Sequence, residues 1–217
     1  MNWKKLFTVL CISALTLVVV LFGGGMLLDG NVELETESTL DASPDAIYSL
    51  IADPAGVIRW WQDAAQEPGH EAMAEVTSRQ GEGPDAGPGA TLLFEMDGKL
   101  LEEWTLISVE PPKEAVWNVD FQMFEVRRTL QLEGLSDGRT RVRWHETGSF
   151  ENPLTRWFTL MPTDAVLENF RGALRILDKK AQEELSARQE AQGEAAASSA
   201  GDDDSAGDDD SASPAAQ

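Results

Sequence analysis

Residues 32–61 read VELETESTLDASPDAIYSLIADPAGVIRWW, and this stretch decides the fold. Over 31–40 glutamates alternate with apolar or small residues, the two-residue period of a strand that buries one face. The Ser-Pro-Asp run at 43–45 then offers an N-cap and a first-turn proline for a short helix. The Asp-Pro pair at 53–54 ends that helix, and a second short helix is expected through 57–61. The stretch therefore predicts one strand followed by two short helices.

Strand patterns dominate the next part of the chain. The Asp-Gly pair at 97–98 is a two-residue hairpin signal between the patterns at 91–96 and 99–109. Further strands are expected at 72–78, 115–121, 124–133 and 139–148, with a Gly/Pro-rich loop at 80–89, a tight reversal near Gln122 and a turn at 137–138. Six strands thus follow the two short helices.

Helical patterns return after residue 150. The Asn-Pro pair at 152–153 predicts a helix as far as Met161, which Pro162 interrupts. A long helix then begins near 163–164 and runs to about Arg188, with apolar residues at helical spacing along one face. An antiparallel meander with one closing helix forms an α+β architecture. We therefore expect a seven-stranded sheet wrapped around the long helix, with a cavity between them.

The N-terminal region holds an uncharged apolar run, residues 6–28, between two lysines and Asp29. At about 1.5 Å per helical residue, this run is long enough to cross a bilayer core of roughly 30 Å. Positive charge before it and acidic residues after it place the N-terminus in the cytoplasm. We expect residues 1–29 to be an inner-membrane anchor with the domain on the outer, periplasmic side. The open alternative is a signal peptide cleaved near Gly23 and Gly25, which would release an exported soluble domain.

The two remaining regions are a globular domain over 30–189 and a tail over 190–217. The tail contains eight acidic residues, no basic residue, and no aromatic or β-branched residue. Such a segment cannot bury enough apolar surface to offset its ordering entropy, so we expect a disordered acidic tail. Its repeated AGDDDS segments do not meet the EF-hand spacing, which requires a glutamate at the twelfth position.

Composition excludes several classes of function. The net charge of −21 is spread over the domain as well as the tail, which argues against binding nucleic acid. Cys11 is the only cysteine, and His70 and His145 are the only histidines. We therefore expect no intrachain disulfide, no metal site and no cofactor.

The order of these motifs resembles the START-like (Bet v 1-like, SRPBCC, helix-grip) superfamily. Within it, the chain is similar to the polyketide cyclase/dehydrase and lipid-transport group, in its membrane-anchored bacterial variant. Besides residues 32–61, the matching stretches are GPGATLLFEMDGKL at 87–100, ISVEPPKEAVWNVD at 107–120, GRTRVRW at 138–144, ENPLTRWFTLM at 151–161 and ENFRGALRILDKKAQEE at 168–184. The resemblance covers about residues 31–188 and implies a pocket for a hydrophobic ligand under the C-terminal helix. It does not imply an enzyme, because the fold carries several functions.

Period-two alternation indicates which side chains face the expected cavity. The predicted ligand-binding residues are Phe94, Trp117, Val119, Arg128, Trp144, Glu146, Phe170, Leu174 and Leu177. The alternative is that the apolar members simply fill a core. Tryptophans 60 and 61 are interpreted as packing residues of the second short helix.

Arg128 and Glu146 are the most distinctive of these residues. Both fall on the apolar face of neighbouring strands, where an unpaired charge is costly, so we expect them to form an ion pair. The pair is either a structural salt bridge or a group that orients a ligand carboxylate or hydroxyl. No arrangement of nucleophile and base is recognisable in the sequence, and no residue is assigned as catalytic.

Three functions remain open from the sequence. The first is a membrane-anchored domain that binds or transfers a hydrophobic small molecule or lipid. The second is a cyclase, dehydratase or hydrolase that uses the same pocket, with Glu146 and Arg128 as its polar groups. The third is a protein-interaction module with a filled core.

Overall fold

The structure is a computed structural model that describes residues 3–64 and 75–201. Its elements are α1 (Trp3–Leu27), β1 (Asn31–Leu40), α2 (Pro44–Ile51), α3 (Pro54–Ala64), β2 (Thr77–Gln80), β3 (Thr91–Met96), β4 (Lys99–Glu110), β5 (Glu114–Asp120), β6 (Glu125–Gly134), β7 (Thr140–Ser149), the 3-10 helix η2 (Thr155–Leu160) and α4 (Thr163–Gly201). The strands form one antiparallel sheet in the order β1-β7-β6-β5-β4-β3-β2. The predicted α+β architecture is confirmed.

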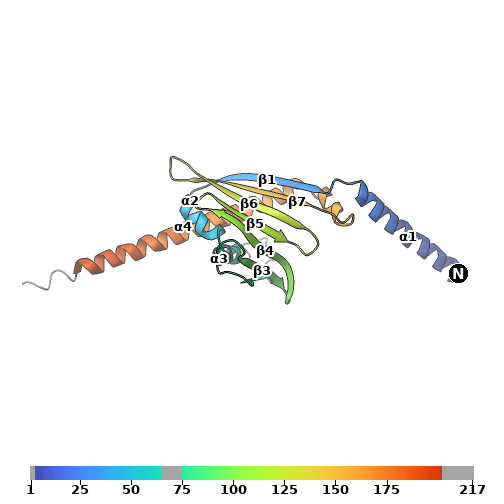
Figure 1. The fold of residues 1–217 in the computed structure, drawn as a ribbon, viewed down its shortest axis with the longest axis horizontal. Helices are drawn as coiled ribbons and strands as arrows, with labels where there is room; N and C mark the ends of the chain where they lie inside the picture. Colours follow the sequence, from blue (N-terminus) through green and yellow to red (C-terminus); the bar gives the residue numbers. More distant parts are fainter. Residues whose placement is uncertain (1–2, 65–74, 202–217) are drawn as a thin grey trace, which may run out of the picture.

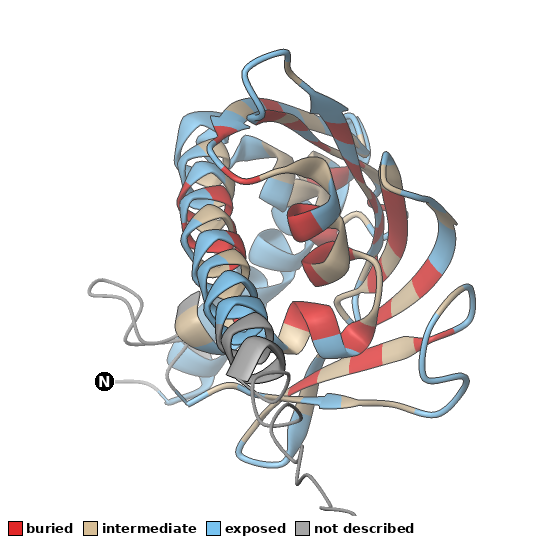
Figure 2. Ribbon diagram, turned by 90° about the vertical axis from the view of Figure 1, so that its left-hand side faces the viewer, coloured by how far each residue is buried: buried red, intermediate tan, exposed pale blue. Residues whose placement is uncertain are grey.

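The sheet curves around α4, which crosses its concave side, and α2 and α3 lie beside the helix (Figures 1 and 2). The helix-grip arrangement follows from strands with one apolar face. In β7, for example, burial alternates from Thr140 to Glu146 in the two-residue period expected of such a strand. The buried side of the sheet and the inner face of α4 together form the core.

Two buried indoles connect the short helices to the core. The N–H of Trp60 donates to the Leu50 carbonyl at 3.1 Å, and the N–H of Trp117 donates to the Ile51 carbonyl at 2.9 Å. The two acceptors lie in the last turn of α2, where carbonyl groups have no partner within the helix. The sheet and α3 therefore satisfy the end of α2, and this interaction fixes the position of the short helices.

The predicted turns are confirmed by backbone conformation. Asp97 and Gly98 both have positive φ, at 52° and 72°, as the hairpin between β3 and β4 requires. Gln122 has a φ of 67° in the reversal between β5 and β6. This reversal is closed by the Phe121 N–H, which donates to the Phe124 carbonyl at 2.9 Å.

Three boundaries differ from the predictions. Residues 72–74 of one predicted strand lie outside the described residues, and the observed strand continues to Gln80. The segment after Asn152 forms a 3-10 helix of six residues, Thr155–Leu160, because it is short and Pro162 follows it closely. Helix α4 continues past Arg188 to Gly201. The added residues are mostly Ala, Glu and Gln, whose intrinsic helix propensity is high. The first part of the predicted disordered tail, residues 190–201, is therefore helical, whereas 202–217 lie outside the described residues and their disorder stays a prediction.

Helix α1 is long and apolar enough to cross a membrane over Leu6–Leu27, and it is exposed over that length except at Gly24 and Gly25, which lie against the domain. A signal sequence has the same properties. The helix is not isolated from the domain, because its last turns contact η2.

Candidate functional site

A cavity of about 770 Å³ lies between the sheet and the N-terminal half of α4. Its wall is formed by the start of β1, the facing ends of β6 and β7, the β5–β6 turn, η2 and α4, together with one residue each from α3 and β4. The residues that line it include Val32, Leu34, Trp61, Glu102, Phe121, Phe124, Val126, Arg128, Trp144, Glu146, Phe150, Phe158, Met161, Val166, Phe170, Ala173 and Ile176. A mostly apolar wall with a few polar groups is typical of a site for a small apolar molecule.

The polar centre of the cavity is an ion pair between Arg128 and Glu146. The two residues are direct partners in the β6–β7 register, and the Arg128 Nε donates to Glu146 Oε1. Their side chains are only 6% and 8% exposed. The indole N–H of Trp144 also donates to Glu146 Oε1, at 3.0 Å. The predicted pair therefore exists, and Glu146 has two donors.

The Arg128 guanidinium is held between two aromatic rings. Its central carbon lies 4.2 Å from the centre of the Trp104 ring and 4.9 Å from that of the Trp144 ring. Cation–π contacts of this kind stabilise a guanidinium that has lost its water. The rings and Glu146 together fix the direction in which the guanidinium points.

A second carboxyl, that of Glu102, lines the same cavity. It accepts a hydrogen bond from the Trp104 indole N–H at 2.8 Å. Burial raises the pKa of Glu102, and the nearby Glu146 adds to the rise, while Arg128 and the hydrogen bond from Trp104 oppose it. Burial is the largest of these effects, so Glu102 is a carboxyl that takes up a proton more readily than usual.

Two N–H donors at the cavity have no hydrogen-bond partner within the described part of the chain. They are Nη1 of Arg128 and Nε1 of Trp61, and both atoms are buried. Buried donors are normally paired, because an unpaired one loses its hydrogen bond to water without compensation. Both residues line the cavity, so its wall contains two unpaired N–H groups.

The nine predicted site residues divide into two groups. Arg128, Trp144, Glu146 and Phe170 line the cavity, and the rings of Trp144 and Phe170 stack at 4.9 Å between centroids. The other five lie in the closely packed core and do not line the cavity: Phe94, Trp117, Val119, Leu174 and Leu177. These five side chains therefore fill the core, which is the alternative that the sequence left open for the apolar residues.

Several cavity residues were not predicted. Glu102 has the same parity on β4 as the buried Trp104, so the two-residue period of that strand would have found it. Trp61 was interpreted as a packing residue, yet it lines the cavity as well. Phe121, Phe124 and Phe158 come from a turn and from η2, where the strand period gives no information.

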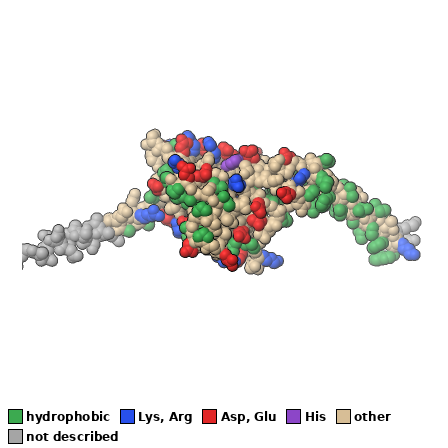
Figure 3. Space-filling view, viewed as in Figure 1, with side chains coloured by type: hydrophobic (Ala, Val, Ile, Leu, Met, Phe, Trp, Pro, Cys, Tyr) green, Lys and Arg blue, Asp and Glu red, His purple; other side chains and the backbone are tan. Residues whose placement is uncertain are grey.

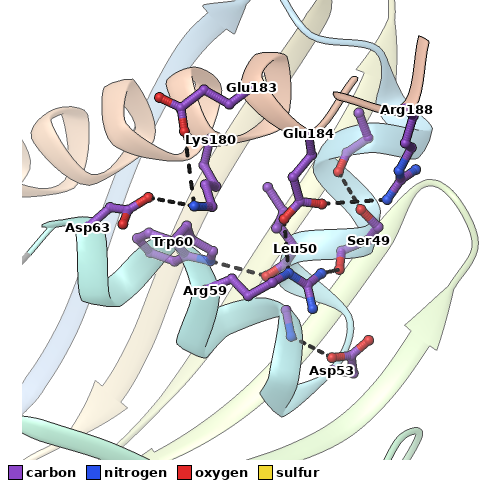
Figure 4. Close-up of polar contacts among 12 residues, drawn as sticks. Ser49, Leu50, Asp53, Arg59, Trp60, Asp63, Lys180, Glu183, Glu184 and Arg188 are labelled. Atoms are coloured by element: carbon purple, nitrogen blue, oxygen red, sulfur yellow. Dashed lines mark hydrogen bonds and ion pairs between the residues drawn. The ribbon is translucent and has the colours of Figure 1, made fainter. Parts of the chain in front are cut away.

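A separate polar cluster joins α3 to α4 (Figure 4). Arg59 donates to Glu184 at 2.9 Å and to the Ser49 carbonyl at 3.1 Å, and Lys180 pairs with Asp63 at 2.8 Å. The Arg59–Glu184 and Lys180–Asp63 pairs are at least partly exposed and lie further along α4 than the part that lines the cavity. We interpret this cluster as a clamp that holds the two helices together. Within the described residues, no group of three His, Cys, Asp or Glu side chains is placed to hold a metal ion.

Comparison with known proteins agrees with this architecture. Residues 31–182 match the sequence model of a family described as polyketide cyclase / dehydrase and lipid transport. Among solved structures, the ginseng major latex-like protein 151 from Panax ginseng is 11% identical with a TM-score of 0.52, covering 69% of this chain and 97% of its own. Ara h 8.0201 is 13% identical with a TM-score of 0.51, covering 71% and 99%. An uncharacterised protein from Rhizobium leguminosarum is 16% identical with a TM-score of 0.50, covering 70% and 95%.

These structural likenesses are those of Bet v 1-like proteins, and at such low identity they concern the fold alone. No curated protein matches the sequence significantly.

Proposed function

The chain belongs to the polyketide cyclase/dehydrase and lipid transport family, and from this premise we propose that it binds a hydrophobic small molecule or lipid under α4. The observation that carries the proposal is the cavity of about 770 Å³. Volumes of roughly 300–1,000 Å³ are typical of sites for small molecules. An interaction module with a filled core would not need such a space.

The ligand of this proposal is an apolar molecule with one hydrogen-bond acceptor, such as a carboxylate or a carbonyl. The acceptor would take the free N–H groups of Arg128 and Trp61, while the apolar part would contact the phenylalanines and Trp144. Satisfying two buried donors favours such a ligand over a pure hydrocarbon. Glu146 already neutralises part of the charge of Arg128, so a carbonyl and a carboxylate are both compatible with the site.

We further propose that α1 stays attached and holds the domain at the outer side of the inner membrane. Two contacts support retention. An added Cβ at Gly25 would lie 1.9 Å from the Pro153 carbonyl oxygen, and one at Gly24 would lie 2.7 Å from the Trp157 ring. Gly25, which would belong to the cleavage site of a signal peptide, is thus a residue that lets α1 pack closely against the domain.

The proposal is tested by filling the cavity in the full-length chain. Ala173 lines the cavity on α4, whereas Ala165 is exposed on the same helix and lies outside it. We expect native mass spectrometry from detergent micelles to show one oleic acid bound per wild-type chain. Ala173→Trp should abolish this complex, and the matched control Ala165→Trp should keep it. Equal binding by the two variants, or no saturable binding by wild type, would refute the proposal.

One observation favours the enzyme as a second candidate function. Glu102 is a carboxyl with a raised pKa beside a second carboxylate and an arginine, an environment suited to a proton donor. A Glu102→Gln variant that keeps oleic acid binding but loses turnover of a bound substrate would support this candidate. Unchanged turnover in that variant would remove it.

A further inference from the structure

The 3-10 helix η2 is fastened to α1 inside the apolar length of that helix. The Trp157 indole N–H donates to the Leu21 carbonyl at 2.8 Å. Arg156 donates to the Leu28 carbonyl at 3.4 Å and to the Phe150 carbonyl at 2.9 Å, so its charge is turned toward the backbone. These bonds and the close approach at Gly24 fix the height of η2 along α1.

The position of η2 along α1 determines how close η2 lies to the membrane. Leu21 lies six residues before Leu27, the end of the apolar segment, which is about 9 Å along a helix. The segment Leu6–Leu27 is itself about 33 Å long, close to the roughly 30 Å of a bilayer core. If the segment spans the bilayer, little length is left over to lift η2 into water. Because Leu21 lies about 9 Å before the end of the segment, the Trp157 contact then falls on the hydrocarbon side of the membrane boundary, next to the interface where tryptophan is enriched.

The surface at this height is apolar. Five exposed side chains from the β5–β6 turn and from residues 154–161 form what we call the collar: Met123, Leu154, Phe158, Leu160 and Met161, which are 43–61% exposed. Between residues 154 and 163 the only charged side chain is that of Arg156. The turn and η2 are joined by ring contacts, with Phe124 and Phe158 centroids 6.1 Å apart. Figures 1 and 3 show the apolar α1 leading directly to this end of the domain.

The collar also borders the cavity, because Phe158 and Met161 belong to both. We propose that the collar is immersed in the headgroup region of the bilayer that α1 crosses, so that the cavity opens onto lipid and not onto water. This inference rests on the proposed retention of α1 and on the proposed ligand site. The partner it assigns to the collar is a lipid surface.

The test uses the full-length chain in phosphatidylcholine vesicles, with Cys11→Ser and one new cysteine that carries the fluorophore NBD. The new cysteine replaces Leu160 or Met123 in the collar, or Ser136 as the matched control. Ser136 is exposed in the β6–β7 turn, at the opposite end of strands that each span ten residues. We expect lipids with a doxyl group near the headgroup to quench NBD at the two collar positions and not at 136. Quenching at the collar positions no greater than at 136 would overturn the proposal.

A second measurement separates the collar from the ligand site. Leu154 and Leu160 belong to the collar and do not line the cavity. With Leu154→Asp and Leu160→Asp together, we expect oleic acid uptake from vesicles to slow by roughly tenfold, since charge is disfavoured at the membrane boundary. The amount bound at equilibrium should not change. Unchanged uptake would count against the collar, whereas absence of oleic acid binding in wild type would count against the proposed function and leave the NBD result standing.

Discussion

Removing Arg128 tests the polar centre of the cavity most sharply. In Arg128→Met the apolar part of the side chain is kept, but Glu146, whose side chain is 8% exposed in the structure, loses its guanidinium partner. Removing one member of a buried ion pair lowers the free energy of unfolding by about 3–5 kcal/mol, because the remaining charge stays buried without a partner. The cation–π contacts with Trp104 and Trp144 are lost as well. We therefore expect the free energy of unfolding to fall by about 3–5 kcal/mol.

The matched control is an exposed pair on the neighbouring strand β7. Arg143 lies 3.4 Å from Glu35 and from Glu37, and the three side chains are 45–54% exposed. Arg143→Met should cost at most about 1 kcal/mol, because water screens an exposed pair. Both variants are measured by urea unfolding of the full-length chain in detergent, followed by tryptophan fluorescence, with a two-state fit that gives the same slope m for each.

The double variant Arg128→Met/Glu146→Gln completes the test. The second substitution removes the stranded charge while it keeps an acceptor for the Trp144 N–H, whose bond to Glu146 is 3.0 Å long. We expect the double variant to recover more than half of the lost stability. A loss for Arg128→Met as small as that for Arg143→Met would refute the description of a buried, mutually dependent pair. No recovery in the double variant would do so too.

Substitutions at Glu102, Gly25 and Leu177 have expected outcomes of their own. Burial raises the pKa of Glu102, so the folded state favours the neutral carboxyl. The stability that this carboxyl contributes to the fold is fully present below the ordinary pKa of 4.5 and is lost as the pH rises above that value. Glu102→Gln, which carries no charge at any pH, should therefore raise the melting temperature at pH 7 more than at pH 4. Gly25→Leu should push α1 away from η2, because an added Cβ meets the Pro153 carbonyl oxygen at 1.9 Å, and faster proteolysis after residue 28 would report the separation. Leu177→Ala should cost about 2–5 kcal/mol, since Leu177 is fully buried in the core, yet leave oleic acid binding unchanged because Leu177 does not line the cavity.

Much of the fold was predictable, because one face of nearly every strand is apolar. The alternation over β1 and β7 and the Asp-Gly pair at 97–98 located strands and a turn almost to the residue. The parity of the strands also placed Arg128 and Glu146 together, as the β6–β7 register does. Successive side chains of a strand point to opposite faces because of the backbone geometry, so the alternation of apolar and polar residues in the sequence predicts directly which side chains are buried.

The cavity itself was only partly predictable. Parity identifies inward side chains, but it does not distinguish the closely packed end of the sheet from the open one. Phe94 and Leu174 lie at the packed end, whereas Trp144 and Phe170 lie at the open one. The difference arises from where α2 and α3 fill the space under the sheet, and this depends on long-range packing. The extension of α4 to Gly201 was missed for another reason, because residues beyond Arg188 have high helix propensity but no apolar face to reveal it.

Photo-crosslinking tests the central claim, a hydrophobic ligand inside the cavity, most directly. The full-length chain in phosphatidylcholine vesicles is irradiated with a fatty acid that carries a diazirine near the end of its chain, and the adducts are located by mass spectrometry. We predict adducts on side chains that line the cavity, such as Trp144, Phe170 and Phe124, and their loss in Ala173→Trp. Adducts confined to α1 and the outer surface, with the same pattern in Ala173→Trp, would contradict this claim.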